Sequence, residues 1–317
     1  MERDSVVLIG SGLMGGGIAA RSALAGNPTV LTDTSPENAQ KGVALACKAI
    51  DELEQNGLAE QEQAARARKL LSWASPIEAA LGRAKFVIEA VFENLELKQK
   101  VFRDADALLP PEIPLATNTS GLRVTDISAL TRHPERCLTT HFWFPAHLVP
   151  LVEVVMGDKT EESVAIFTKE MLVKWGKAPV LVKKDLPGQL ANRILQAVIR
   201  EAVNIVSIGL ASPEDVDTAV KMGMGIRFPA WGPLEHIDAV GLDLAVSVQD
   251  TVLPQISMRK EADEYLRALL EKGCLGYKTT RGIYDWSKKD MDELAAKRNA
   301  FIIHALKMVG PKTEEHS

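Results

Sequence analysis

The fold is decided by the stretch Val6-Val-Leu-Ile-Gly10-Ser-Gly12-Leu-Met-Gly15-Gly-Gly17, near the start of the 317-residue chain. An apolar run that leads into G-x-G-x-x-G and then into a helix is typical of folds that bind a dinucleotide. The first glycine permits a tight turn, the second lets the backbone approach a pyrophosphate, and the third lets the helix pack on the strand. The residues predicted to contact the cofactor are Gly10, Gly12, Leu13, Met14 and Gly15.

One carboxylate distinguishes between the two nicotinamide dinucleotides. Asp33 follows the second predicted strand and stands 21 residues after Gly12. A carboxylate at this place accepts hydrogen bonds from the ribose hydroxyls of NAD, and it repels the 2′-phosphate of NADP. The alternative is a tight turn with a surface aspartate. The sequence therefore favours NAD as the cofactor.

Short apolar runs alternate with amphipathic stretches through the first half of the chain, which is typical of crossover units in a parallel sheet. Between Asp51 and Leu71, two helical patterns broken at Asn56-Gly57 predict a helical hairpin inserted between strands. We therefore expect an α/β fold with a Rossmann-type, mostly parallel, doubly wound sheet. The predicted strands are Val6–Ile9, Thr29–Thr32, Phe86–Val91, Pro114–Thr117, Cys137–Phe144, Val152–Met156 and Val180–Lys183, and the main helical stretches are Met14–Ala25, Pro36–Gln55 and Leu95–Leu108.

The pattern changes after Pro187-Gly188, beyond which the sequence has helical periodicity and no period-2 strand. The chain is also longer than one hydrophobic core usually supports. We expect two domains, residues 1–186 for the cofactor-binding sheet and residues 187–317 for a smaller all-helical domain. The helical stretches predicted there are Leu190–Ile208, Pro213–Met222, Ala230–Leu253 and Glu261–Lys272.

Composition argues against several classes of protein. Hydrophobic residues make up 46% and charged residues 25%, as in ordinary globular proteins, and the net charge of -5 disfavours a nucleic-acid partner. The three cysteines are far apart, which fits reduced thiols in a reducing compartment. We find neither a signal-peptide pattern nor an apolar run of about 20 residues that could span a membrane. We therefore expect a cytoplasmic protein with no membrane partner.

Two ionisable residues fall inside predicted strands. His141 lies in an apolar strand that runs into a loop ending in proline, and Glu153 lies in the next strand. Buried ionisable groups are costly unless they are paired, and adjacent strands could bring these two together. A carboxylate on one imidazole nitrogen raises the basicity of the other, which suits removal of a hydroxyl proton. On spacing alone, a satisfied core histidine and a strand-end carboxylate remain an alternative, and no cluster has the spacing of a metal site.

Seven ordered motifs are similar to those of one family. Through them the chain resembles the L-3-hydroxyacyl-CoA dehydrogenase family, from Ser5 to about Trp286. The resemblance implies NAD-dependent oxidation of a 3-hydroxy group to a 3-oxo group, as in fatty acid metabolism, and a homodimer formed through the helical domain. The motifs are Gly10–Gly17, Glu89–Asn94, Asn118–Ser120, His141–Glu153, Pro187–Arg193, Gly232–Asp238 with Gly241–Asp243, and Gly276–Tyr284.

The resemblance also implies roles for individual residues. His141 is the general base, and Glu153 orients it. Ser120 and Asn192 hydrogen-bond the reacting oxygen or the acyl carbonyl, where they stabilise developing charge. The residues implied to contact NAD are Glu93 and Lys98, beside its nicotinamide half, Ser120, and Lys278 from the C-terminal region.

Three departures from the family concern the substrate. Phe144 stands where the family has the asparagine of His-Phe-Phe-Asn-Pro, so a hydrogen-bonding amide is lost. The hairpin arm Ile50–Gln55 is acidic where acyl-CoA members carry lysines for the CoA phosphates. Val149-Pro150 and Arg227 look like the lambda-crystallin and gulonate dehydrogenase branch, which acts on small carboxylates without CoA; Arg227 could hold a substrate carboxylate or be a surface residue. Basic residues on the second arm that could compensate are Arg66, Arg68 and Lys69.

The sequence supports three functional hypotheses. The leading one is a 3-hydroxyacyl-CoA dehydrogenase, and the second is a dehydrogenase of a small β-hydroxy carboxylate without CoA. Both take a small-molecule substrate. The third is a non-catalytic NAD-binding protein like the lens crystallins of the family, which only Phe144 favours.

Overall fold

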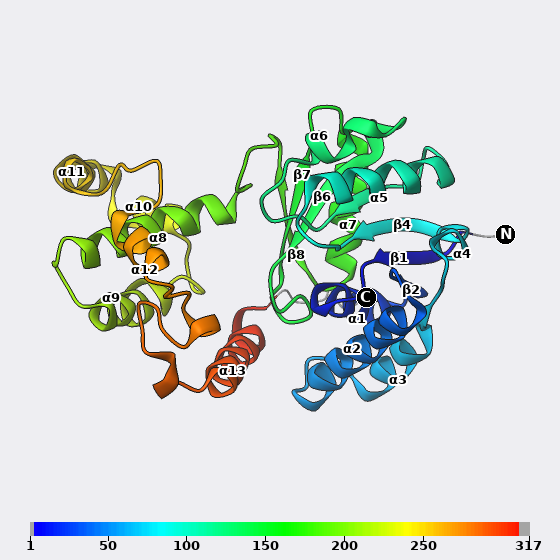
Figure 1. The fold of residues 1–317 in the computed structure, drawn as a ribbon, viewed down its shortest axis with the longest axis horizontal. Coiled ribbons are helices and arrows are strands. Elements are labelled where there is room, and N and C mark those ends of the chain that lie inside the picture. The colour runs from blue at the N-terminus through cyan, green and yellow to red at the C-terminus, as the bar shows by residue number, and fades with distance from the viewer. Residues whose placement is uncertain (1–2, 311–317) are drawn as a thin grey trace. The chain divides into compact units, whose positions relative to one another are not determined.

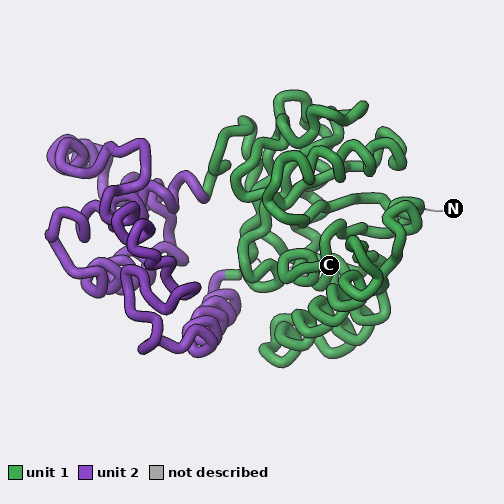
Figure 2. Tube along the Cα trace, in the orientation of Figure 1, with its two compact units in different colours: residues 1–191, 310–317 green, residues 192–309 purple. Residues whose placement is uncertain are grey.

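The structure is a computed structural model that describes residues 3–310. Within this range the chain forms two compact units, residues 3–191 with Gly310 and residues 192–309 (Figure 2). No helix in the described range is long and apolar enough to cross a membrane.

The first unit is built on an eight-stranded sheet in the order β3-β2-β1-β4-β5-β6-β7-β8. Neighbouring strands pair in parallel except β6 and β7, which are antiparallel. The predicted, mostly parallel sheet is therefore confirmed, and each predicted strand is found within two residues at either end. The strands are β1 (Ser5–Ile9), β2 (Thr29–Thr32), β3 (Leu71–Trp73), β4 (Ala84–Glu89), β5 (Leu115–Thr117), β6 (Cys137–Phe142), β7 (Leu151–Met156) and β8 (Ala178–Val182).

Helices cover both faces of this sheet. In Figure 1, α5 and α6 lie on one side of the sheet and α1, α2 and α3 on the other. The doubly wound arrangement follows from strands that are buried on both faces, as all five residues of β1 are. The helices are α1 (Leu13–Leu24), α2 (Pro36–Gln55), α3 (Gln61–Leu70), α4 (Ile77–Leu81), α5 (Leu95–Leu108), α6 (Val124–Ile127) and α7 (Glu162–Lys174).

One core fixes the carboxyl ends of the central strands. Val7 and Ile9 of β1 pack with Phe102 and Ala105 of α5 in a cluster in which all four are buried. Burying a large apolar side chain stabilises the fold by about 1.5–3 kcal/mol. Strand order reverses between β1 and β4, and in open sheets of this kind ligands bind in the crevice beyond the carboxyl ends of such a pair.

The predicted helical hairpin is present as α2 and α3. Asn56 caps the end of α2, and Gly57 follows with φ of +67°, a backbone conformation that favours glycine. The sequence did not reveal β3, because its three residues continue the hairpin pattern directly and only Leu71 is buried. Pairing with β2 makes this segment a strand.

The second unit is helical, and none of its described residues forms a strand beyond two isolated bridges. The stretch Ala230–Leu253, expected as one helical region, forms two helices because Gly241 has φ of +102°. The last helix lies outside the predicted stretches. The helices are α8 (Ala191–Ser207), α9 (Pro213–Ala219), α10 (Pro233–Val240), α11 (Leu242–Val252), α12 (Glu264–Glu271) and α13 (Met291–Val309).

Candidate active site

Two glycines of the loop after β1 are required by the packing of the chain itself. Gly10 has φ of +103°, and a Cβ placed there would lie 2.6 Å from the backbone oxygen of Ala90. A Cβ on Gly15 would lie 2.0 Å from the backbone oxygen of Gly10. Because both neighbours are backbone atoms, no side-chain movement relieves these contacts. The loop can approach β4 and carry α1 only with glycine at both places.

Gly12 differs from these two glycines. It caps the N-terminus of α1, and a Cβ placed there would meet no other atom of the chain within 4 Å. Leu13, the next residue, is 64% exposed. The first turn of α1 thus presents its N–H groups beside a cradle that a side chain would fill, which fits the pyrophosphate of a dinucleotide. The residues present fit the predicted cofactor.

Asp33 is joined to the same loop. Its Oδ2 accepts hydrogen bonds from the backbone N–H of Ser11 at 2.8 Å and from the Ser11 hydroxyl at 2.9 Å. Its Oδ1 accepts from the backbone N–H of Thr34 at 2.7 Å. Burial raises the pKa of Asp33, but these hydrogen bonds outweigh it and hold the pKa below its ordinary value. An ionised carboxylate therefore stands next to the glycine loop.

The sequence analysis did not predict the roles of Ser11, which donates to Asp33, and of Gly42, which packs against Ser11. Gly42 of α2 lies against the loop, since a Cβ there would come within 2.4 Å of the Ser11 Cβ. The signal was weak, because Ser11 occupies a variable position of the motif and Gly42 interrupts an otherwise ordinary helix.

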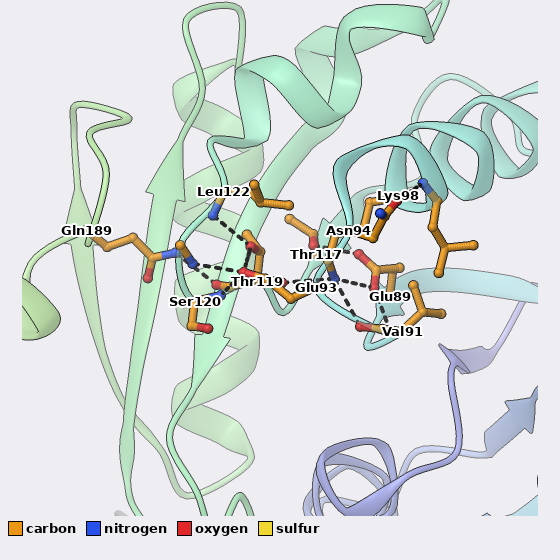
Figure 3. Close-up of polar contacts among 12 residues, drawn as sticks. Glu89, Val91, Glu93, Asn94, Lys98, Thr117, Thr119, Ser120, Leu122 and Gln189 are labelled. Atoms are coloured by element: carbon orange, nitrogen blue, oxygen red, sulfur yellow. Dashed lines mark hydrogen bonds and ion pairs between the residues drawn. The ribbon is translucent and has the colours of Figure 1, made fainter. Parts of the chain in front are cut away.

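A buried ion pair lies at the carboxyl end of β4 (Figure 3). Lys98 Nζ lies 2.7 Å from Glu89 Oε1, and their side chains are 1% and 0% exposed. Glu89 also accepts hydrogen bonds from the Thr117 hydroxyl and from the Val91 backbone N–H, each at 2.6 Å. A buried charge of this kind needs such partners to be stable. Glu89 was not predicted, although an acid at the end of a buried strand calls for a cation.

Glu93 fixes the loop that carries Ser120. One carboxylate oxygen, Oε1, accepts from the Thr119 hydroxyl at 2.6 Å and from the backbone N–H groups of Ser120 at 3.1 Å and Gly121 at 3.0 Å. Lys98 Nζ lies 3.5 Å from its other oxygen. Burial raises the pKa of Glu93, and these partners together hold it below its ordinary value. The predicted residues Glu93, Lys98 and Ser120 are thus brought into one network.

His141 and Glu153 face each other across the antiparallel pair β6 and β7, where they are register partners. The distance from His141 Nδ1 to Glu153 Oε2 is 2.7 Å, and the side chains are 8% and 0% exposed. Adjacent positions on paired strands share a face of the sheet, so the pairing follows from the register itself. The two residues that the sequence placed in neighbouring strands are in one environment.

Glu153 accepts further hydrogen bonds besides its contact with His141. Trp143 Nε1 donates to Oε2 at 3.1 Å, and the backbone N–H groups of Leu190 and Ala191 donate to Oε1 at 2.8 Å each. Burial alone would raise the pKa of Glu153, but the bonds from His141, Ala191, Trp143 and Leu190 lower it to about 2. The carboxylate is therefore ionised at neutral pH.

The loop between β6 and β7 is fastened from two sides. Lys177 Nζ donates to the backbone oxygens of Ala146 and Val149, and His147 Nε2 lies 2.9 Å from Glu52 Oε2 on α2. Phe144, which stands in place of the family asparagine, is 51% exposed. The tethered loop keeps the ends of both strands, and with them His141 and Glu153, in fixed relation.

Three predicted residues belong to the second unit. Asn192 is near the start of α8, Arg227 is exposed in the turn between α9 and α10, and Lys278 is exposed in the turn Tyr277–Thr279. Their roles toward the cofactor and the substrate stay predictions.

Comparison with known proteins decides the family. The model for the NAD-binding domain of 3-hydroxyacyl-CoA dehydrogenase matches residues 5–186, and the model for its C-terminal domain matches residues 188–286. The chain belongs to the 3-hydroxyacyl-CoA dehydrogenase family. It is accordingly an NAD-dependent dehydrogenase that acts on CH–OH donors.

Relatives within the family differ in what they act on. The chain is 32% identical over 294 residues to 5-formyl-3-hydroxy-2-methylpyridine 4-carboxylate 5-dehydrogenase of Mesorhizobium japonicum, covering 93% of this chain and 94% of that protein. The crystal structure of an enzyme of that name, described as an NAD⁺-dependent dismutase, superposes with a TM-score of 0.89 at 31% identity, covering 98% and 99% of the two chains. The structure of 3-hydroxybutyryl-CoA dehydrogenase from Escherichia coli K12 gives 0.75 at 34% identity, covering 92% of this chain and 61% of that one.

Proposed function

We propose that the chain oxidises a secondary hydroxyl group to a carbonyl with His141 as the general base and Glu153 as its orienting partner. The observation that carries this proposal is the 2.7 Å contact between His141 Nδ1 and a fully buried Glu153. A carboxylate bound to Nδ1 keeps the proton on that nitrogen and leaves Nε2 free to accept one. Because the pKa of Glu153 is about 2, the carboxylate keeps its charge when the imidazole takes up the proton.

Each group then has one role in the proposed oxidation. NAD⁺ supplies the hydride acceptor when bound. Nε2 of His141 removes the hydroxyl proton, so that the carbon can give up its hydride and the oxygen becomes a carbonyl. The charge that forms on His141 is balanced by Glu153. Glu93 fixes the backbone of Ser120, whose hydroxyl and Asn192 are proposed to hydrogen-bond the reacting oxygen.

The residues proposed to hold the cofactor lie around the glycine loop. Gly12 and the first turn of α1 would hold the pyrophosphate, and Asp33 would hold the adenosine ribose. By resemblance to the family, we propose that Glu93 and Lys98 contact the nicotinamide half of the cofactor and that Lys278 is a further cofactor-binding residue.

Asp33→Ala should weaken the binding of NAD by roughly 10- to 100-fold, because hydrogen bonds to a charged group contribute about 1.5–3 kcal/mol. Binding of NADP should become measurable, since the repulsion of its 2′-phosphate is removed. Titration calorimetry with both dinucleotides checks this. Ser11→Ala is the control, since it removes only one neutral donor to Asp33 and should change NAD binding far less. Unchanged NAD affinity in Asp33→Ala contradicts the assignment.

We further propose that the substrate is a small hydroxy carboxylate without CoA. In the hairpin that would bind the CoA phosphates, charged side chains are already paired with other residues of the chain. Arg68 Nη2 lies 2.6 Å from Asp51 Oδ1 and also contacts Glu54, while Glu52 is paired with His147. An arginine held between two carboxylates offers little attraction to a phosphate, and the surrounding acids repel one.

Similarity to relatives supports the same substrate class. The structure with the TM-score of 0.89 belongs to an enzyme named for a pyridine 4-carboxylate, whereas the acyl-CoA enzyme gives 0.75. Arg227 is exposed and could bind a substrate carboxylate with two parallel hydrogen bonds.

A substrate panel should separate the two classes. We expect NADH formation with free 3-hydroxy acids at a kcat/KM well above that for 3-hydroxybutyryl-CoA. Reversing the charges of the two exposed basic residues of α3, in Arg66→Glu with Lys69→Glu, should leave KM for either substrate unchanged. A high kcat/KM for 3-hydroxybutyryl-CoA that collapses in this double variant would instead assign the hairpin to CoA.

A second copy of the chain is the proposed partner. None of the residues of α8 to α12 is buried. On α8 alone, Ile194 is 55% exposed, Leu195 39% and Ile199 38%. A helical unit with so little covered apolar surface fits one that is buried against a partner, and closed symmetric dimers are the commonest solution.

Sedimentation should give twice the mass of one chain. Ile199→Asp, which places a charge on the apolar face of α8, should shift the equilibrium toward the monomer. The control Lys169→Asp, at an exposed position of α7, should leave the equilibrium unchanged. A monomeric wild-type protein at micromolar concentration would refute the dimer.

A further inference from the structure

One donor to Glu153 comes from a residue that the family pattern does not predict. Trp143 directly follows β6 and takes the second phenylalanine position of His-Phe-Phe-Asn-Pro. A phenyl ring has no N–H, whereas the indole Nε1 donates to Glu153 Oε2 at 3.1 Å. This is the same oxygen that lies 2.7 Å from His141 Nδ1.

We propose that Trp143 is a positioning residue that fixes the orientation of the Glu153 carboxylate and weakens the interaction of this carboxylate with the His141 N–H. The proposal rests on the proposed role of His141 as the base. Glu153 Oε1 is held by two backbone N–H groups, so the orientation of Oε2 depends on the two side-chain donors. The Trp143 ring also packs near His141, with centroids 5.7 Å apart and planes inclined by 51°.

Sharing one oxygen has a consequence for the chemistry. The indole N–H draws on negative charge of Oε2 that would otherwise act on the His141 N–H alone. Without the indole donor, the carboxylate stabilises the protonated imidazole more strongly, so the base stays protonated to a higher pH. The acidic limb of the pH profile should therefore move upward.

Neighbouring elements bring an apolar residue and a lysine near this pair. Val180 of β8, the register partner of Glu153 on its other side, is apolar. Lys177 lies 5.7 Å from the ring centroid of Phe142, the neighbour of His141 in β6. His141 and Trp143 contact Glu153 through their side chains, and Leu190 and Ala191 donate to it through their backbone N–H groups.

Two variants test the proposal. Trp143→Phe restores the family residue, and replacement of Trp143 by benzothienylalanine keeps the shape of indole but has sulfur in place of the N–H. In both, we expect the acidic limb of kcat/KM to move up by about half a pH unit, and kcat at neutral pH to fall roughly 3- to 10-fold. KM for NAD should be unchanged. Trp73→Phe, on the edge strand β3, is the matched control.

A merely structural tryptophan predicts a different outcome. In that case kcat falls in Trp143→Phe, returns with benzothienylalanine, and the acidic limb stays in place. That result, or a limb that moves to lower pH, overturns the proposal. The proposed function is tested separately by His141→Gln. Near-normal turnover in that variant refutes the assignment of His141 as the base. If His141→Gln loses turnover but the acidic limb of Trp143→Phe does not move, only the role of Trp143 is refuted.

Discussion

His141→Gln should lower kcat by about 10²- to 10⁴-fold, the usual contribution of a positioned general base, and should leave the affinity for NAD nearly unchanged. Glutamine can accept a hydrogen bond from the substrate hydroxyl, but it does not take up the proton at neutral pH. Since His141 lies in β6 and not in the glycine loop, its loss should not disturb the cradle of α1. Steady-state NADH formation and calorimetric NAD binding measure the two quantities.

His147→Gln is the matched control for this variant. His147 lies in the loop that follows β6 and is bonded to Glu52 of α2, so it shares the neighbourhood but not the Glu153 contact. We expect its kcat to stay close to wild type, because the glutamine amide can still donate a hydrogen bond to Glu52 and keep the loop in place. If His147→Gln lost turnover while His141→Gln kept it, the assignment of the base would be wrong.

Gly15→Ala has the second large effect, because it separates α1 from the turn after β1. Its Cβ would lie 2.0 Å from the Gly10 carbonyl oxygen, a backbone atom that no rotamer change can move. Overpacking of this kind costs at least about 1–3 kcal/mol, and here it acts on the cofactor loop itself. We expect a clear fall in Tm together with loss of NAD binding.

Gly12→Ala is the informative counterpart. A Cβ at Gly12 meets no atom of the chain within 4 Å, so the folded protein should keep its Tm. NAD affinity should nevertheless fall, because the methyl group occupies the cradle proposed for the pyrophosphate. Thermal melts with and without NAD distinguish the two variants, and a lowered Tm of unliganded Gly12→Ala would contradict this reading of the loop.

Local patterns were enough to predict the sheet. Apolar runs of four to eight residues between amphipathic stretches predicted seven of the strands, and the glycine motif predicted the junction of β1 with α1. The roles of the two glycines after Gly15 needed the structure. A Cβ on Gly16 would approach Leu45 Cβ at 2.8 Å, and one on Gly17 would approach Ala146 Cβ at 3.1 Å. Gly16 therefore lets α2 pack closely on α1, and Gly17 does the same for the loop between β6 and β7.

The partners that support the site residues could not be predicted, because they depend on which atoms the fold brings together. Glu89 pairs with Lys98 on the following helix, which only the fold brings near. The Trp143 donor and the two backbone donors to Glu153 depend on the register of β6 with β7 and on the path of the chain after β8. Sequence spacing indicates which strands are neighbours, but it does not fix which atoms share a carboxylate.

The most direct test of the central claim is the pH dependence of single-turnover NADH formation, measured for the wild type and for His141→Gln with the same hydroxy substrate. We predict that the wild-type rate falls in acid as the imidazole is protonated, and that the small residual rate of the variant has no such limb. An acidic limb of the same position and slope in both proteins would show that another group removes the proton.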